Sequence, residues 1–447
     1  MARIDDLPTE ILSKILLAAL PTYWFRSRPF SERLSISQVC SRWRAICLET
    51  PHIWRRISYT QYRDEDKWRD EDVAALREYL ERSAGATLSV TLGDYRVQND
   101  VDALRGGLPC ISDLWSVVFA ESRRWRVAHF VLDEGVPIPV PYDGPLNVPE
   151  LEEAGVVCPV DPDLAYPIEF YDTAFRWFAN APKLRRLCIG EPFLPSVVEV
   201  AWERLTHLNF GLSAEFLQEY VTEILPRCTA LEHLEVSNVY EMDWEEGLPV
   251  VEIPTLCALV LHDEAVFLCC YLHVPHLERL AFIVDDNGPQ RSHRDAFLML
   301  ARRHPLGELR YLYVNAQLRL WSNVDAMLEH TPGLTYLHIA DSSRWRPPPE
   351  LSRICAIGRL QPLRTLSLQL DASGWNSLGA ATQLAAEFAL LPELEKFEMW
   401  NKRDDPDYDT AFDEQWLKGL LERGVVVEKR PWFPHLPGNS DAWESDE

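Results

Sequence analysis

Three histidines are the side chains whose spacing comes closest to that of a chemical site. His207, His233 and His262 each fall in a short apolar-rich segment of the strand type, and neighbouring strands of a sheet lie about 4.8 Å apart. Imidazoles at that separation could in principle bind Zn²⁺. His262, however, is offset along its segment, and no cysteine or carboxylate completes a ligand set at fixed spacing. The pattern therefore favours solvated or hydrogen-bonded histidines, and we expect no metal.

Sequence signatures of catalysis are also missing. The chain has no nucleophile elbow, phosphate-binding glycine loop, H-E-x-x-H helix or catalytic Cys/His motif, and only proximity connects Cys228 with His233. Arginine clusters at Arg123–Arg124, Arg302–Arg303 and Arg344–Arg346 could bind a phosphate, although such charges more often lie on a solvated helix or loop. We therefore expect that the chain is not an enzyme and needs no cofactor.

The elements that would carry these side chains follow from a pattern that returns along most of the chain. The pattern is apolar-x-x-apolar-x-apolar, and its clear copies lie 21 to 32 residues apart. One such unit cannot bury its own apolar face but stacked units can, so a period of this size predicts a solenoid. The clear copies are led by Leu184, Leu205, Leu231, Leu256, Leu277, Leu309, Leu334, Leu363 and Leu394, and two weaker copies start at Trp125 and Leu151.

This pattern resembles the leucine-rich repeat, in which L-x-x-L-x-L recurs every 20–29 residues or so. The resemblance implies an α/β fold, a leucine-rich-repeat solenoid of horseshoe shape, which we place at 87–430. Proline-rich loops at 133–167 would interrupt it, and an acidic tail at 431–447 would cover the last repeat with Trp432 and Phe433. Helices between the strands are predicted at 213–225, 292–303, 323–330 and 376–391.

Strand alternation assigns particular side chains to the concave face of this predicted sheet. The first, fourth and sixth residues of each copy would point into the core, and the third, fifth and seventh would point to the concave face. Aromatic residues there favour a protein-binding surface, since tyrosine and tryptophan are enriched in binding hot spots, but cross-strand packing would explain them equally well. The predicted substrate-binding residues are His207, His233, Tyr311, Tyr313, Tyr336, His338, Glu398 and Trp400. The same face would carry Asn209, Glu235, His262, Arg279, Asn315 and Lys396.

The amino-terminal segment has a helical period instead. One apolar stripe recurs at three- and four-residue steps from Ile11 to Ala19, and a second recurs from Ile36 to Cys47 before Pro51. Roughly fifty residues in two or three short helices make only a small core. Part of this apolar set is therefore expected to face a partner.

The amino-terminal segment resembles the F-box in several anchors that occur in order. They are LPTEIL near its start, a hydrophobic run, VCSRWR, and the P-x-x-W step of Pro51 and Trp54, although the link over 21–32 is longer and more aromatic than in that family. The resemblance implies an all-α F-box domain at 1–57 that binds the Skp-type adaptor of SCF ubiquitin ligases. It places at or behind the adaptor surface Leu7, Pro8, Ile11, Leu12, Val39 and Trp43.

Some of these six residues have a second interpretation. Leu12, Val39 and Trp43 could equally be core residues of a helical cap, whereas partner contact is favoured for Leu7 and Pro8 at the exposed start of the motif. Residues 58–86 are predicted to be a charged linker and helix. Within them, 59–72 is expected to be an exposed connector because it is too polar to form a core, and 72–83 is expected to be helical.

Composition limits the possible partners and compartments. The net charge is −25 and the isoelectric point is near 4.9, so repulsion from phosphates and anionic lipids argues against binding to nucleic acid or a membrane surface. The ten cysteines are scattered without C-x-x-C spacing, as in reduced proteins of cytoplasmic and/or nuclear location. The sequence shows no signal peptide and no apolar run long enough to span a membrane.

Taken with the resemblance, these features predict a substrate-recognition subunit of an SCF-type E3 ubiquitin ligase. The F-box would bind the Skp-type adaptor and, through it, a cullin, while the repeats would bind a protein substrate that the sequence does not identify. The alternative is a scaffold that binds an adaptor without delivering a substrate. The ubiquitin part rests on the resemblance, because spacing and composition indicate only a docking segment and a solenoid.

Overall fold

A computed structural model of the chain describes 4, 7–20, 36–61, 70–94, 109–131, 144–157, 176–190, 198–212, 216–238, 247–283, 292–303, 306–315, 327–340, 362–370, 391, 393–401 and 421–431. The chain divides into two compact units, Met1–Leu205 and Thr206–Glu447. The long parallel sheet has 14 strands, of which five belong to the first unit and nine to the second. We describe each unit by itself.

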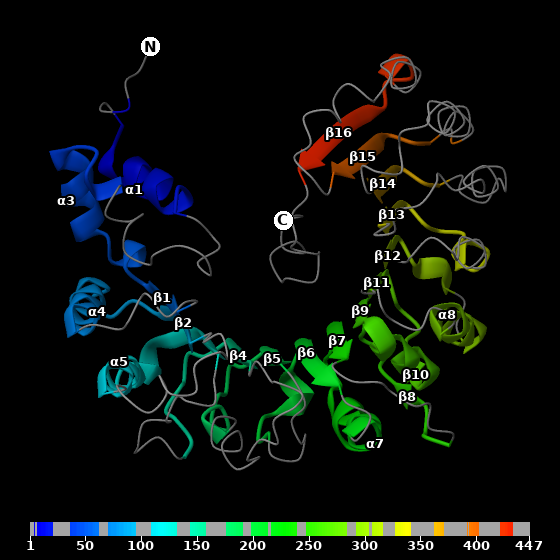
Figure 1. Ribbon diagram of the computed structural model, residues 1–447, viewed down its shortest axis with the longest axis horizontal. Coiled ribbons are helices and arrows are strands. Elements are labelled where there is room, and N and C mark those ends of the chain that lie inside the picture. The colour runs from blue at the N-terminus through cyan, green and yellow to red at the C-terminus, as the bar shows by residue number, and fades with distance from the viewer. Residues whose placement is uncertain are drawn as a thin grey trace, which may run out of the picture. The chain divides into compact units, whose positions relative to one another are not determined.

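The first unit begins with a helical headpiece, which we define as α1 (Thr9–Ala18), α3 (Ser41–Glu49) and the 3₁₀ turn η2 (Pro51–Ile53). The two helices pack against each other (Figure 1). Pro8 immediately precedes α1, and the Cys40 sulfur caps α3 by accepting a hydrogen bond from the Trp43 backbone N–H at 3.4 Å. The helix predicted from Ile11 to Ala19 is confirmed by α1, whereas the one predicted from Ile36 to Cys47 begins only at Ser41, because Cys40 is extended and caps it.

Five parallel strands in sequence order follow the headpiece. The two weaker repeat copies, at Trp125 and Leu151, are confirmed as strands. The strands are β1 (Arg56–Gln61), β2 (Leu88–Asp94), β3 (Trp125–Val131), β4 (Glu153–Val157) and β5 (Arg186–Gly190). The helical segments are α4 (Asp70–Arg82), α5 (Pro109–Phe119) and the 3₁₀ turns η4 (Ser122–Arg124) and η6 (Trp202–Arg204).

The predicted connector at 59–72 is wrong at both ends. Strand β1 runs on to Gln61, and α4 already begins at Asp70. The uncharged residues Tyr59, Thr60 and Gln61 can continue β1 because pairing with β2 uses only the backbone, while Ile57 and Ser58 bury their side chains.

The second unit contains nine parallel strands and a separate two-stranded sheet, β8 with β10. Each clear repeat copy of this unit contains a strand, and each of these strands begins two residues after the lead leucine. The strands are β6 (His207–Leu212), β7 (His233–Asn238), β8 (Val251–Glu252), β9 (Ala258–His262), β10 (Leu272–His273), β11 (Arg279–Ile283), β12 (Tyr311–Asn315), β13 (Tyr336–Ala340), β14 (Thr365–Leu370), β15 (Lys396–Asn401) and β16 (Val426–Pro431). The sequence pattern did not predict β8, β10 or β16.

Helical segments of the second unit lie on one face of its strands (Figure 1). Helix α8 (Ser292–Arg303) occupies the predicted range. The segment predicted as a helix at 213–225 is broken instead, because Thr222 donates its hydroxyl to the Gln218 carbonyl and Pro226 has no N–H to donate. The segments are α7 (Leu217–Glu219), the π turn η8 (Tyr220–Ile224), and the 3₁₀ segments η9 (Leu225–Arg227), η10 (Asp263–Cys270) and η11 (Leu306–Glu308).

Some predicted features lie wholly or mainly outside the described residues. They include the tail with its Trp432 and Phe433 cover, the helix at 376–391, much of the helix at 323–330 and most of the proline-rich loops at 133–167. No described helix combines the length and the apolar character that crossing a membrane requires.

Burial of the repeat leucines forms the core of both units. The lead, fourth and sixth positions of the copies are buried wherever their side chains are described; in the repeat at Leu231, for example, Leu231, Leu234 and Val236 are all fully buried. Burying a leucine side chain contributes about 1.5–3 kcal/mol, so a repeated set of three is enough to hold each strand to one face.

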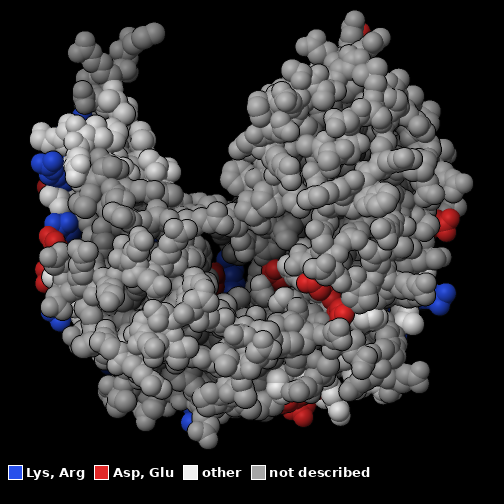
Figure 2. All heavy atoms as spheres, viewed as in Figure 1, with Lys and Arg blue, Asp and Glu red and all other residues white. Residues whose placement is uncertain are grey.

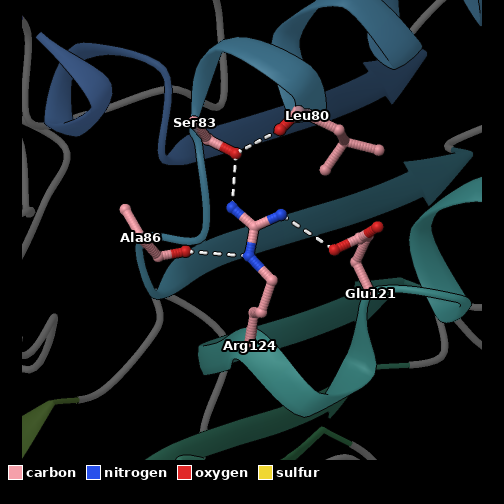
Figure 3. Close-up of polar contacts among 5 residues, drawn as sticks. All are labelled: Leu80, Ser83, Ala86, Glu121 and Arg124. Carbon is pink, nitrogen blue, oxygen red and sulfur yellow. Dashed lines mark hydrogen bonds and ion pairs between the residues drawn. The ribbon is translucent and has the colours of Figure 1, made fainter.

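A single arginine ties α4, β2 and β3 of the first unit together (Figure 3). The turn after α4 passes through Ala84 and Gly85 with φ of +42° and +79°, a left-handed conformation that is strained for alanine. Arg124 holds this turn by donating to the Ala86 carbonyl at 3.0 Å and to the Ser83 hydroxyl. A third hydrogen bond, to Glu121 at 2.8 Å, orients the guanidinium.

Replacing Arg124 should therefore destabilise the first unit. Arg124→Met keeps the length of the side chain but leaves the buried Ser83 hydroxyl with one partner fewer, so we expect a loss of about 1–3 kcal/mol. The urea midpoint followed by tryptophan fluorescence measures it, and Arg77→Met, an exposed arginine of α4, is the matched control. Equal midpoints for the two variants would mean that Arg124 does not hold the turn.

Candidate functional site

The headpiece has a compact core that joins it to α4. Leu12 and Leu16 of α1 pack with Ile46 and Cys47 of α3, and burial raises the pKa of the Cys47 thiol. Other members of the cluster are Leu20, Ile53, Trp54 and Tyr79.

Trp54 is the central side chain of this cluster. Its indole N–H donates to the Cys47 carbonyl at 2.7 Å, and its ring meets Tyr79 edge to face at 4.7 Å. The Arg82 guanidinium lies 4.6 Å from the centre of the indole ring. Since Tyr79 and Arg82 belong to α4, these contacts fix the headpiece against that helix.

A second apolar set of the headpiece points to solvent. Val39 is 62% exposed and Ile11 is 43% exposed. The described residues include eight exposed large apolar side chains, and five of them lie in or just before the headpiece: Ile4, Ile11, Ile15, Val39 and Leu48. Uncharged side chains (white) make up most of the described surface near the amino terminus in Figure 2. A concentration of this kind marks a surface that another protein covers.

The structure separates the six predicted adaptor-binding residues into two groups. Pro8, Ile11 and Val39 are exposed, whereas Leu7 and Trp43 are half-buried against the core cluster. Leu12 is 0% exposed and lies behind this surface as a core residue. The assignment of all six to an adaptor surface remains a prediction.

Sequence analysis missed part of this surface. Ile15 was predicted to lie in the first apolar stripe, and Leu48 was assigned to neither stripe. Both side chains are exposed in the structure. Successive helix residues are about 100° apart, so Ile11 and Ile15 form one line and Leu12 and Leu16 form another. The width of the apolar stripe could have indicated this exposed surface. A stripe that includes both the Ile11–Ile15 line and the Leu12–Leu16 line is wider than the helix face that packs against the core.

In the first unit, the sheet face opposite the buried side chains carries a small charged group. Glu153 lies 2.9 Å from His129 Nε2 and 3.5 Å from the Arg186 guanidinium. Burial alone would raise the pKa of Glu153, but the hydrogen bonds and charges of His129 and Arg186 outweigh it and lower the pKa overall. Gly155 permits the arrangement, because a Cβ there would lie 2.9 Å from the His129 ring.

In the second unit, equal repeat positions of neighbouring strands face each other in register. Tyr311 pairs with Tyr336, and Tyr313 pairs with His338. We call two of the resulting lines the third-position row and the fifth-position row. The third-position row is His233, Ala258, Arg279, Tyr311, Tyr336, Thr365 and Lys396, and the fifth-position row is Glu235, Val260, Ala281, Tyr313, His338, Ser367 and Glu398.

Aromatic rings stack along both rows. The rings of Tyr311 and Tyr336 lie 4.3 Å apart and nearly parallel, and those of Tyr313 and His338 lie 4.4 Å apart. His338 also contacts the Ser367 hydroxyl at 2.7 Å. The structure thus brings together four of the predicted substrate-binding residues as two cross-strand stacks, Tyr311 with Tyr336 and Tyr313 with His338.

A charged network continues from the rings to the end of the sheet. The Tyr336 hydroxyl donates to Glu398 at 3.2 Å, and Lys396 lies 2.8 Å from Glu398 and 3.1 Å from Glu428. Burial raises the pKa of Tyr336, and the Glu398 charge raises it further, so the hydroxyl stays protonated and able to donate. Burial would lower the pKa of Lys396, but the two glutamates outweigh it and raise the pKa.

Several predicted substrate-binding side chains are buried in the isolated chain. Tyr313 is 1% exposed, and His233, His338 and Glu398 are also buried, while His207, Tyr311 and Tyr336 are half-buried. The Trp400 side chain lies outside the described residues. The other seven predicted residues lie in the two rows, except His207, which pairs with His233 beside the third-position row. Their role in substrate binding remains a prediction.

The three histidines first singled out do not converge. His207 and His233 stack with ring centres 5.4 Å apart, whereas His262 contacts Glu235 at 3.0 Å. In the part of the chain that the structure describes, no three histidine, cysteine or acidic side chains lie together as metal ligands would.

Two of the three arginine clusters have structural contacts. Arg124 holds the turn after α4, and Arg303 donates to the Cys270 carbonyl. Arg344–Arg346 lies outside the described residues.

Comparison with known proteins identifies only the amino-terminal segment. Residues 4–60 match the F-box-like family model, which covers the headpiece and β1. No curated protein matches the chain. Among solved structures, a Bacteroides fragilis protein is similar over 64% of this chain and 68% of its own, with 12% identity and a TM-score of 0.32. The amino-terminal segment is therefore an F-box-like domain.

The charged group around Glu153 predicts acid-sensitive stability of the first unit. The pKa of Glu153 is lower in the folded chain than the value of about 4.3 expected when unfolded, so its stabilising effect is complete above that value and is lost as the pH falls through the folded-state pKa. The urea midpoint of Glu153→Gln should lie below that of the wild type at pH 5.5, and the gap should close as the pH falls to about 3. Glu152→Gln, at an exposed neighbouring glutamate, is the control; a gap that does not depend on pH would contradict this cause.

Proposed function

We propose that this chain is a substrate receptor of an SCF-type ubiquitin ligase, in which the F-box-like domain binds a Skp-type adaptor and the repeats bind a protein substrate. The observation that carries the proposal is the exposed apolar set of Ile11, Ile15 and Val39 on a domain that matches the F-box-like model. F-box domains typically bind such adaptors, and an adaptor covering this surface would remove the apolar area from water. That burial contributes about 25 cal/mol per Å².

The repeat part of the proposal is a leucine-rich-repeat horseshoe that holds the substrate. Its support is the L-x-x-L-x-L period, the strand that starts two residues after each lead leucine, and the helices on one face of these strands. Repeats of this kind present long continuous faces to protein partners.

In this proposal the chain makes and breaks no bond. It would act by raising the effective concentration of the substrate near the conjugating enzyme of the ligase. The seven described cysteines are free thiols, as expected for a chain that works in the cytoplasm or nucleus. Partners other than adaptor, cullin and substrate, including nucleic acid and membranes, have no place in it.

Charged substitutions on the exposed apolar set should abolish adaptor binding without unfolding the chain. Ile11→Asp and Val39→Asp each place a carboxylate where an apolar contact is expected, and the loss in adaptor affinity should be at least about tenfold. Val250→Asp, at a valine of the second unit that is 50% exposed, is the matched control. Pull-down of a purified Skp-type adaptor measures binding, and thermal melting confirms the fold; full binding by both headpiece variants would refute the adaptor surface.

Affinity purification of the tagged chain tests whether it joins a ligase. We expect recovery of both the adaptor and a cullin, and loss of both with Ile11→Asp. Adaptor without cullin would instead support a scaffold that delivers no substrate.

A further inference from the structure

One arginine of the headpiece joins two segments that are far apart in the sequence. Arg42, in the first turn of α3, donates a guanidinium N–H to the backbone carbonyl of Leu7, just before α1. Both residues are half-buried. A hydrogen bond whose donor carries a charge is roughly twice as strong as a neutral one. Arg42 therefore holds the segment that enters α1 against the start of α3.

The carbonyl that Arg42 binds lies at the entry to α1. The Leu7 backbone N–H donates to the Ile4 carbonyl at 3.3 Å, which brings Leu7 back toward Ile4. The helical ladder starts one residue later, where the Pro8 carbonyl accepts from the Leu12 N–H at 3.0 Å. Pro8 has no N–H, so it cannot anchor the chain through a backbone donor of its own. The hydrogen bond from Arg42 thus fixes the chain at a point that the helical ladder does not reach.

The two joined segments carry exposed apolar side chains of the headpiece. At the entry to α1, Ile4 is 47% exposed and Pro8 is exposed as well. Three residues before Arg42, Val39 is 62% exposed, and its N–H donates to the Ile36 carbonyl at 3.4 Å. A partner that covers both segments must meet them in one arrangement, and Arg42 sets that arrangement before the partner binds.

The packing of α1 on α3 does not depend on this arginine. The buried contact between the helices is made by Leu12 and Leu16 on one side and by Ile46 and Cys47 on the other. Arg42 is not a member of that cluster. Loss of its side chain should therefore loosen the entry to α1 while the two helices stay packed.

We infer that Arg42 is a positioning residue for partner binding, because it holds Ile4 and Pro8 beside the segment of Val39 in the free chain. This inference rests on the proposed function, since the partner is the Skp-type adaptor. A segment that is ordered in advance loses less entropy on binding, so the same apolar contacts give a higher affinity. Arginine suits this role because its guanidinium has five N–H donors and can bind a carbonyl while it contacts other groups. Arg42 does have at least one further interaction.

Adaptor titration of two methionine variants of the full-length chain tests the inference. Arg42→Met should weaken the binding of a purified Skp-type adaptor about tenfold, because the segment must then be ordered on binding. Arg44→Met is the matched control, at an exposed arginine of the same helix whose Nε donates to the Ser37 carbonyl at 3.3 Å. It removes the same charge and should change the affinity less than about twofold. Equal losses for the two variants would mean that charge and not position matters, which would overturn the inference.

A purely structural role of Arg42 would give a different pattern. In Arg42→Met, backbone hydrogen exchange over 4–12 should be faster, while exchange over 43–49 and the melting temperature should match those of Arg44→Met. Arg42→Lys keeps a charged donor and should restore the affinity to within about threefold of the wild type. Faster exchange throughout the headpiece, with a lower melting temperature, would make Arg42 a residue of stability alone and overturn the inference.

A double-mutant cycle shows whether the effect of Arg42 passes through the segment that it holds. Ile4→Ala should weaken adaptor binding about threefold in the wild-type chain but change it little in Arg42→Met, where Ile4 is no longer held in place. Additive losses would mean that the two residues act independently, which contradicts the inference. No loss from Ile4→Ala in either background would remove this segment from the interface and overturn the inference too.

The same titrations separate this inference from the proposed function. Wild-type binding that Arg42→Met leaves unchanged would overturn the inference and leave the adaptor role intact. A wild-type chain that binds no adaptor would overturn both.

Discussion

The parallel register between neighbouring repeat strands is the constraint on which the second unit depends. Each lead leucine is buried, and each strand starts two residues after it, so pairing sets equal repeat positions side by side. Tyr311 therefore lies beside Tyr336, and Tyr313 beside His338. A slip of one residue would turn every side chain to the other face and expose the leucines. The leucines thus position the ring stacks and ion pairs on the opposite face without touching them.

This constraint explains how much of the fold could be predicted from the sequence. The nine strands that follow a lead leucine bury alternate residues and recur at a regular spacing, and all nine were predicted, as was α8. Strand β1 was missed because RISYTQ has no lead leucine and its polar end pairs with β2 through the backbone, and β16 was missed because VVVEKR has no lead leucine either. The helix at 213–225 was predicted too regularly, since Pro226 ends the ladder of backbone hydrogen bonds there.

The candidate sites were predicted less completely than the fold, because residue type does not determine exposure. Sequence reasoning identified the headpiece but left Val39 equally open to a core or a partner-facing position, and it grouped Ile11 with Leu12 in one stripe, whereas the structure turns Val39 and Ile11 to solvent and buries Leu12. It also placed Tyr313 and His338 on one face, which the register confirms. It did not predict that both are buried, because burial depends on what packs over a face and not on alternation within a strand.

The two surfaces differ in what they require of a partner. In the headpiece, Ile11 and Val39 expose apolar atoms to water in the isolated chain, so any complementary apolar surface is stabilised by covering them. In the fifth-position row, Glu398 and His338 already have polar partners, so a ligand must replace those contacts with good geometry or lose more free energy than it gains. The first arrangement favours affinity and the second favours selectivity. On the proposed function, a receptor needs the first for the adaptor that it always carries and the second for the substrates among which it must discriminate.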